Sequence, residues 1–128
     1  MTTPEFLRID EVIDIHRDQI ERYGGHDGLC DAHALLSAIA MPQSGAGREY
    51  FHRDLFEMAA AYLFHIVQNH PFVDGNKRTG LAAALVFLDL NGVEIEAGQD
   101  ELAEFVLEIA QGKHDKAAIA EYLRQIAA

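Results

Sequence analysis

The sequence is poor in cysteine, in basic side chains and in long apolar runs. Cys30 is the single cysteine in 128 residues, which excludes a disulfide within the chain. The longest apolar stretch, residues 81–88, is far short of the roughly 20 residues that cross a bilayer. Nothing in the sequence resembles a signal peptide. We therefore expect a soluble, cytoplasmic protein.

Basic residues are outnumbered two to one by acidic ones. The chain carries 10 Lys and Arg against 21 Asp and Glu, a formal charge of −11. Such a charge repels a phosphate backbone, so general nucleic-acid binding and ribonuclease activity are disfavoured. With 49% apolar residues, the chain is long enough for one domain with a hydrophobic core and too short for two. Residues 1–128 are expected to form that single domain.

Helical periodicity dominates the sequence and predicts an all-α fold. Residues recur at the spacing of one helix face in the stripe Val12, Ile13, His16, Ile20 and Tyr23. Similar segments predict about six helices, with candidate N-caps at Asp31, Asn76, Asp100 and Asp115. Residues 81–88 are apolar on every face, which is typical of a buried central helix. We expect a compact bundle around that helix, because no set of strands is available for a sheet.

The densest group of chemically active side chains lies between two predicted helices, in the stretch His70-Pro71-Phe72-Val73-Asp74-Gly75-Asn76-Lys77-Arg78-Thr79-Gly80. Pro71 disfavours helical geometry at His70 and has no backbone N–H to donate, so the helix over residues 53–69 should end there. Residues 73–75 are typical of a turn. Asn76 can then cap the second helix.

The start of the second helix is suited to an anion. Its first amides, around residues 76–79, have no intrahelical acceptor and lie at the positive end of the helix dipole. Lys77 and Arg78 add two cations there. Asp74 is placed to hold a divalent metal that bridges phosphate oxygens, and His70 can accept a proton from a hydroxyl at neutral pH. Together these groups favour transfer of a phosphorus-containing group from a nucleotide to an alcohol.

Each member of this group has a simpler structural explanation when taken alone. A histidine before a proline is more often a cap or a packed side chain than a base. Lys77-Arg78 alone is usually a solvated helix start, Asp74-Gly75 alone is usually a turn, and Phe72 alone is core. The functional hypothesis rests on their joint spacing, which these separate explanations do not account for.

Three other histidines are assigned structural roles. His16 lies on an apolar helical stripe and is expected to be a hydrogen-bonded core or interface histidine rather than a catalytic one. His52 and His65 are not expected to form a metal site with His70. His65 and His70 are five residues apart, and that spacing does not place two imidazoles on one helix face.

The stretch His-Pro-Phe-x-Asp-Gly-Asn-Lys-Arg-Thr at residues 70–79 resembles the active-site motif of the Fic/Doc superfamily. It is most similar to the death-on-curing branch, the toxins of bacterial toxin–antitoxin pairs. The resemblance covers nearly the whole chain and implies a Fic/Doc-like helical domain. It includes Ile15-His16, Tyr23-Gly24-Gly25, Gly28-Leu29 with Asp31, Leu35-Leu36, Pro42-Gln43 and Asn91-Gly92-Val93.

The resemblance implies a role for each residue of the motif. His70 would be the general base on the target hydroxyl, and Asp74 would coordinate Mg²⁺. Gly75 and Asn76 would hold phosphate of ATP through backbone and amide groups. Lys77 and Arg78 would neutralise its charge. Phe72 would anchor the loop in the core.

The resemblance implies different reactions according to the residues at two positions, because these distinguish adenylyl transfer from transfer of the terminal phosphate. Adenylylating Fic enzymes have Gly at the position of Lys77 and a second Arg at the position of Leu81. The death-on-curing branch shares the Lys and is known as a group of kinases that transfer the terminal phosphate of ATP. In its best-known member the target is a threonine of elongation factor Tu, and translation stops. The alternatives are a Fic-type adenylyltransferase and a catalytically silent module that binds a nucleotide or an acidic partner segment.

The resemblance also implies partners. The sequence contains no inhibitory helix of the pattern Ser/Thr-x-x-x-Glu, so the inhibitor is expected in trans. It would be a small antitoxin whose disordered tail folds into a helix against the toxin. In the superfamily, the segment before the first active-site helix forms a flap that holds the target chain. Residues 44–52 are therefore the segment expected to form this flap and hold the target chain beside His70, with a plain surface loop as the alternative.

Overall fold

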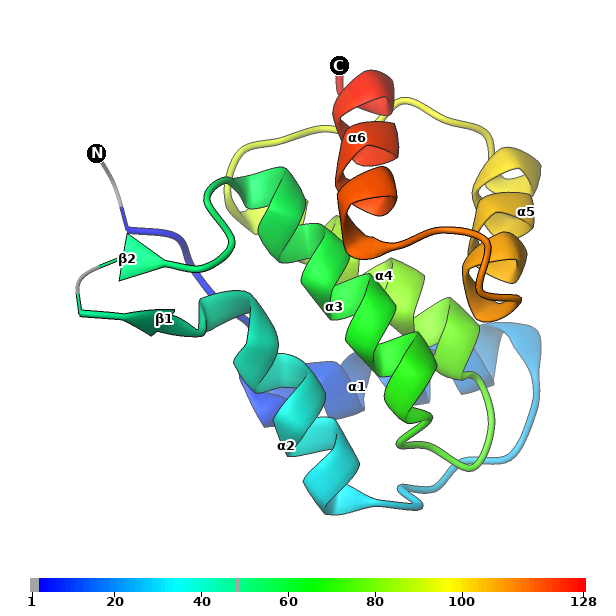
Figure 1. Ribbon diagram of the computed structural model, residues 1–128. Helices are drawn as coiled ribbons and strands as arrows, with labels where there is room; N and C mark the ends of the chain where they lie inside the picture. Colours follow the sequence, from blue (N-terminus) through cyan, green and yellow to red (C-terminus); the bar gives the residue numbers. More distant parts are fainter. Residues whose placement is uncertain (1–2, 48) are drawn as a thin grey trace.

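The computed structural model describes residues 3–47 and 49–128. Within these residues the chain forms six α-helices and one two-stranded antiparallel hairpin (Figure 1). The helices are α1 (Ile9–Tyr23), α2 (Ala32–Ala40), α3 (Leu55–Asn69), α4 (Asn76–Leu90), α5 (Gln99–Ala110) and α6 (Lys116–Ile126). The hairpin strands are β1 (Gly45–Ala46) and β2 (Glu49–Tyr50), and a 3-10 helix, η1 (Met41–Gln43), follows α2. The predicted all-α fold is confirmed, and no described helix has the length and apolarity to cross a bilayer.

The helix at the centre of the fold is α3, whereas the sequence predicts α4. α3 packs against α2, α4, α5 and α6 (Figure 1), and its Ala59-Ala60-Ala61 run is fully buried. α4 packs against α1, α3 and α5, yet Val86 is 37% exposed and Leu90 45% exposed. The prediction is wrong because an apolar run does not show how many neighbours a helix has. Small side chains let neighbouring helices approach α3 from several sides.

Two of the four predicted helix N-caps are confirmed. The Asp31 carboxylate accepts from the Ala34 amide at 3.0 Å and starts α2. The Asp115 carboxylate accepts from the Ala118 amide at 2.8 Å and starts α6. Asp100 is not a cap, because α5 begins one residue earlier, after Gly98. Asp100 lies in the first turn instead, where its charge still favours the helix dipole.

The structure contradicts the flap position expected for residues 44–52 and favours the alternative of a surface loop. The hairpin leads into the N-terminal end of α3, whereas His70 follows the C-terminal end (Figure 1). A helix of 15 residues is about 22 Å long at 1.5 Å per residue, so the hairpin cannot lie beside His70. Arg48, within the same segment, is outside the described residues. The error arises because proximity to α3 in sequence does not decide which end of the helix a segment meets.

A lysine with two histidines joins α6 to α3. The Lys116 ammonium lies 3.2 Å from Nε2 of His65 and 3.4 Å from Nε2 of His52. An ammonium has only protons to donate, so both rings accept and are neutral. Burial, the Lys116 charge and then His52 lower the pKa of His65 to about 4. Burial and Lys116 also lower the pKa of His52, against opposing effects of Glu57 and the Met41 backbone.

This cluster predicts that acid weakens the fold. An unfolded histidine titrates near pH 6.5, whereas the pKa of folded His65 is about 4. Between these values the unfolded chain binds a proton that the folded chain does not, so the free energy of unfolding falls as the pH falls through this window. His65→Gln removes this titration, so the free energy of unfolding should fall less between pH 7.5 and pH 5. The difference from the unsubstituted protein should be on the order of 1 kcal/mol, because His65 is partly exposed.

Urea unfolding at pH 7.5 and pH 5 measures this difference. The exposed His33 provides a control, since His33→Gln removes a histidine that does not contact Lys116. An equal pH dependence in the His65→Gln variant and the unsubstituted protein would contradict the assignment.

Candidate active site

His70 lies at the junction between α3 and the following turn. α3 ends at Asn69, as Pro71 predicts, and the His70 amide donates to the Ile66 carbonyl at 3.2 Å. The backbone of His70 is left-handed, with φ 51° and ψ 54°. Among the described residues it is the one non-glycine residue with positive φ, a conformation held only where surrounding contacts impose it. The side chain is exposed.

The buried Asn76 side chain holds this turn through hydrogen bonds to the Phe72 backbone. Asn76 is 4% exposed. Its Oδ1 accepts from the Phe72 amide at 2.9 Å, and its Nδ2 donates to the Phe72 carbonyl at 2.9 Å. The expectation that Asn76 caps α4 is wrong, because the side chain is engaged with Phe72. Gly75 is the N-cap, with φ 79°.

The same amide reaches His70. Asn76 Nδ2 lies 3.1 Å from Nδ1 of His70. The Phe72 N–H and C=O fix which end of the amide is nitrogen, so Asn76 donates and His70 accepts. The neutral His70 ring then carries its proton on Nε2. Any phosphate contact of Asn76 comes from its main-chain N–H, because its side chain is committed to Phe72 and His70.

The first turn of α4 carries the groups from which an anion site is predicted. Its first N–H groups have no intrahelical acceptor, but Thr79 is not one of them, contrary to expectation, because its N–H donates to the Gly75 carbonyl at 2.9 Å. Lys77 is exposed there. Arg78 is held in place, since its Nη2 donates to the Gly24 carbonyl at 2.9 Å and its guanidinium lies 5.7 Å from the centre of the Tyr23 ring. Positive charge and free amides therefore meet at one helix end.

The Asp74 carboxylate is oriented by two backbone amides. Oδ1 accepts from the Gly75 N–H at 2.8 Å and Oδ2 from the His26 N–H at 3.3 Å. The hydrogen bond from His26 and then that from Gly75 lower the pKa of Asp74, burial opposes them, and the Arg78 charge adds a smaller lowering effect. Asp74 is therefore ionised at neutral pH. Each oxygen keeps a lone pair for a metal such as Mg²⁺.

A single pocket of about 680 Å³ contains every residue that the sequence predicts for the site. This volume is in the usual range for small-molecule sites, about 300–1,000 Å³. The predicted residues on its wall are His70, Asp74, Gly75, Asn76, Lys77 and Arg78. Val67, Gln68, Val73 and Ala110 complete it. In the described part of the chain no three His, Cys, Asp or Glu side chains gather around one point.

The segment between α1 and α2, residues 24–31, lies against the motif, which the sequence reasoning missed. The Gly28 carbonyl accepts from the Val73 N–H at 3.0 Å, and the Pro71 carbonyl accepts from Cys30 at 2.8 Å. Leu29 and Phe72 form an isolated antiparallel bridge. The glycines at 24, 25 and 28 are the available signal, because close approach of two backbones favours residues without a side chain.

His16 is buried behind the turn, as the sequence predicts. It is 1% exposed and hydrogen-bonded to the Asp74 carbonyl. What the sequence does not reveal is that its partner belongs to the motif, 58 residues further along the chain.

Comparisons with known proteins agree with this geometry. A family model described as Fic/DOC family matches residues 6–88. "Protein kinase doc" of Escherichia phage P1 is 37% identical over 117 residues, which are 91% of each chain. "Toxin Doc" of Mycolicibacterium smegmatis is 37% identical over 108 residues, which are 83% of each chain. The likeness therefore extends well beyond the motif.

The close contact between Gly25 and Asp74 predicts a selective effect of one methyl group. A Cβ at Gly25 would lie 2.6 Å from Asp74 Oδ2, whereas one at Gly24 would meet nothing within 4 Å. Both residues have positive φ, so Gly25→Ala and Gly24→Ala should each lose about 1 kcal/mol of stability or more. Only Gly25→Ala should displace the carboxylate from the His26 N–H and raise the pKa of Asp74.

Carbon-detected NMR titration of the Asp74 carboxyl in both variants measures this pKa, with urea unfolding to compare their stabilities. An Asp74 pKa that is unchanged in Gly25→Ala, or equally raised in both variants, would show that the contact does not orient Asp74.

Proposed function

This chain belongs to the Fic/DOC family, and from that membership and the geometry of its turn we propose that it is a protein phosphotransferase. It moves the terminal phosphate of ATP to a Ser or Thr hydroxyl of a target protein. The observation that supports this most is the pocket in which His70, Asp74 and the first turn of α4 meet. Binding of an anion alone requires neither a base nor a metal carboxylate.

The phosphates of ATP bind at the N-terminal end of α4. The free amides of the first turn and the Lys77 and Arg78 charges neutralise them. Asp74 would hold Mg²⁺, and its lowered pKa keeps the carboxylate ionised for that role. When bound, this ion supplies positive charge that stabilises the phosphate oxygens during transfer.

His70 acts as the base. The target hydroxyl oxygen bonds to the terminal phosphorus, the bond from that phosphorus to the bridging oxygen breaks, and ADP leaves with the electron pair. Nε2 of His70 takes the hydroxyl proton. This requires the ring proton on Nδ1, so Nδ1 must release Asn76. The release breaks one hydrogen bond and leaves the two bonds of Asn76 to Phe72 intact, and catalytic hydrogen bonds commonly rearrange when substrate binds.

Transfer of the terminal phosphate is favoured over adenylyl transfer by two residues. Lys77 is on the pocket wall, where its side chain reduces the space for inner phosphates. Leu81, at the position of the second arginine of adenylylating enzymes, packs against the hydrophobic core. One relative is also named a protein kinase. Adenylyl transfer remains the alternative reaction, and a silent binding module the alternative outside enzymes.

The proposed biological role is that of a toxin that arrests translation. One relative is named a toxin, and the resemblance to the death-on-curing branch suggests elongation factor Tu as the target and a small antitoxin as the inhibitor. A small co-purifying protein that suppresses transfer would support the antitoxin. Normal growth of cells that express this chain alone would count against the toxin role.

Labelled ATP provides the test of the reaction. Purified protein is incubated with Mg²⁺, purified elongation factor Tu or a bacterial lysate, and ATP labelled at either the terminal or the innermost phosphate. We expect label only from the terminal phosphate. His70→Ala should reduce it about 10²–10⁴-fold, the usual contribution of a general base.

His33→Ala is the matched control, because it removes an exposed histidine outside the pocket. Label from the innermost phosphate would establish adenylyl transfer instead. No His70-dependent label from either position would overturn the enzyme proposal. Label on a lysate protein other than elongation factor Tu would overturn the target and leave the reaction unchanged.

A further inference from the structure

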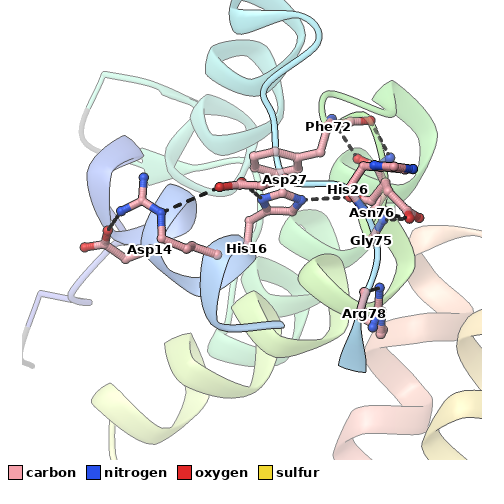
Figure 2. Close-up of polar contacts among 11 residues, drawn as sticks. Asp14, His16, His26, Asp27, Phe72, Gly75, Asn76 and Arg78 are labelled. Atoms are coloured by element: carbon pink, nitrogen blue, oxygen red, sulfur yellow. Dashed lines mark hydrogen bonds and ion pairs between the residues drawn. The ribbon is translucent and has the colours of Figure 1, made fainter. Parts of the chain in front are cut away.

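His16 connects α1 to three successive parts of the active-site turn (Figure 2). Its ring stacks on Phe72 with 3.8 Å between ring centres and an angle of 4° between the planes. Its Nε2 lies 2.7 Å from the Asp74 carbonyl oxygen. A Cβ on Gly75 would lie 3.7 Å from Cδ2 of the same ring. The turn therefore rests on one buried imidazole.

The hydrogen bond to Asp74 fixes a particular peptide group. A carbonyl oxygen can only accept, so Nε2 of His16 is the donor. The carbonyl of Asp74 and the N–H of Gly75 belong to one planar peptide unit. His16 holds the oxygen end of that unit, and Asp74 Oδ1 accepts from the N–H end at 2.8 Å. The direction of the peptide and the orientation of the carboxylate are therefore coupled.

Loss of the His16 donor would release this peptide unit. Gly75 has no side chain to limit rotation, and its φ of 79° lies in the left-handed region that glycine adopts without steric cost. If the unit turned over, the carbonyl oxygen would point toward the Asp74 carboxylate, and the Gly75 N–H would no longer orient it.

We propose that His16 is a positioning residue that sets the orientation of the Asp74 carboxylate through the Asp74–Gly75 peptide. The residue does not touch the substrate. The inference rests on the proposed function only for its effect on phosphotransfer, because the effect on the peptide is a property of the free protein.

The charged groups on the other side of His16 contribute little to holding its ring in place. Asp27 lies 3.6 Å from Nδ1 of His16 and is 59% exposed, and Arg17 lies 3.9 Å from Asp27. These separations are too long for hydrogen bonds, and exposed pairs of this kind are weak. Figure 2 shows Asp27 on the opposite side of His16 from Gly75. Asp27→Asn is therefore expected to behave like the unsubstituted protein.

Two substitutions separate the hydrogen bond from the ring stack. His16→Phe keeps an aromatic ring on Phe72 and removes the donor. His16→Gln keeps an N–H donor at similar reach and removes the aromatic stack. Val12→Ala, at a fully buried position of α1, controls for a general loss of stability. If His16 merely fills the core, His16→Phe will be the milder change, and this outcome would overturn the proposal.

Phosphotransfer is measured against Mg²⁺ concentration at saturating ATP. His16→Phe should raise the Mg²⁺ requirement or lower kcat by about 10–100-fold, the usual effect of removing a group that orients a metal carboxylate. His16→Gln should recover most of this loss. Val12→Ala and Asp27→Asn should match the unsubstituted protein.

A second readout does not depend on catalysis. The Gly75 amide should exchange its hydrogen faster and shift its NMR resonance in His16→Phe, but not in His16→Gln or Val12→Ala. An unchanged Gly75 amide in His16→Phe overturns the positioning role even if phosphotransfer is found. Suppose that the Gly75 amide changes in His16→Phe but no phosphotransfer is found. This result would support the positioning role and contradict only the proposed function.

Discussion

The side-chain amide of Asn76 is the contact on which the rest of the turn depends. One donor and one acceptor satisfy the N–H and the C=O of Phe72, and the second donor proton reaches His70. A carboxylate of the same shape has no proton to donate and would leave the Phe72 carbonyl without a partner. Because Phe72 is also the ring on which His16 stacks, this amide links His70, the core and α1.

The local charge of the pocket opposes the charge of the whole chain. The net charge is −11, which slows the approach of an anionic nucleotide from a distance. At physiological ionic strength such fields decay over about 8 Å. Within the pocket the charges of Lys77, Arg78 and Asp74 and the first turn of α4 lie nearest to the ligand, so binding there depends on groups in direct contact with it.

Much of the site could be predicted from sequence because its residues are contiguous. A proline, a turn and a helix start fix the relative positions of His70, Asp74 and Lys77 over a few residues. Contacts from α1 and from the segment that follows it could not be predicted, because hydrogen bonds of His16, Gly24 and His26 to the motif depend on how distant segments pack. The same limit explains why α3 rather than α4 is central, and why the hairpin lies far from His70. Periodicity gives the apolar face of a helix but not its neighbours.

The span between His16 and Asp74 has a consequence for the order of folding. α3 and α4 are adjacent in sequence and can pair early, whereas the contact of His16 with Asp74 closes a separation of 58 residues. Closing a loop of this length costs conformational entropy, and the other contacts of α1 help to offset that cost. A partly folded chain with α1 detached would retain the helical pair and the motif but would lack the support beneath Asp74. The assembled site is thus a property of the completed fold rather than of the helical hairpin that contains its sequence motif.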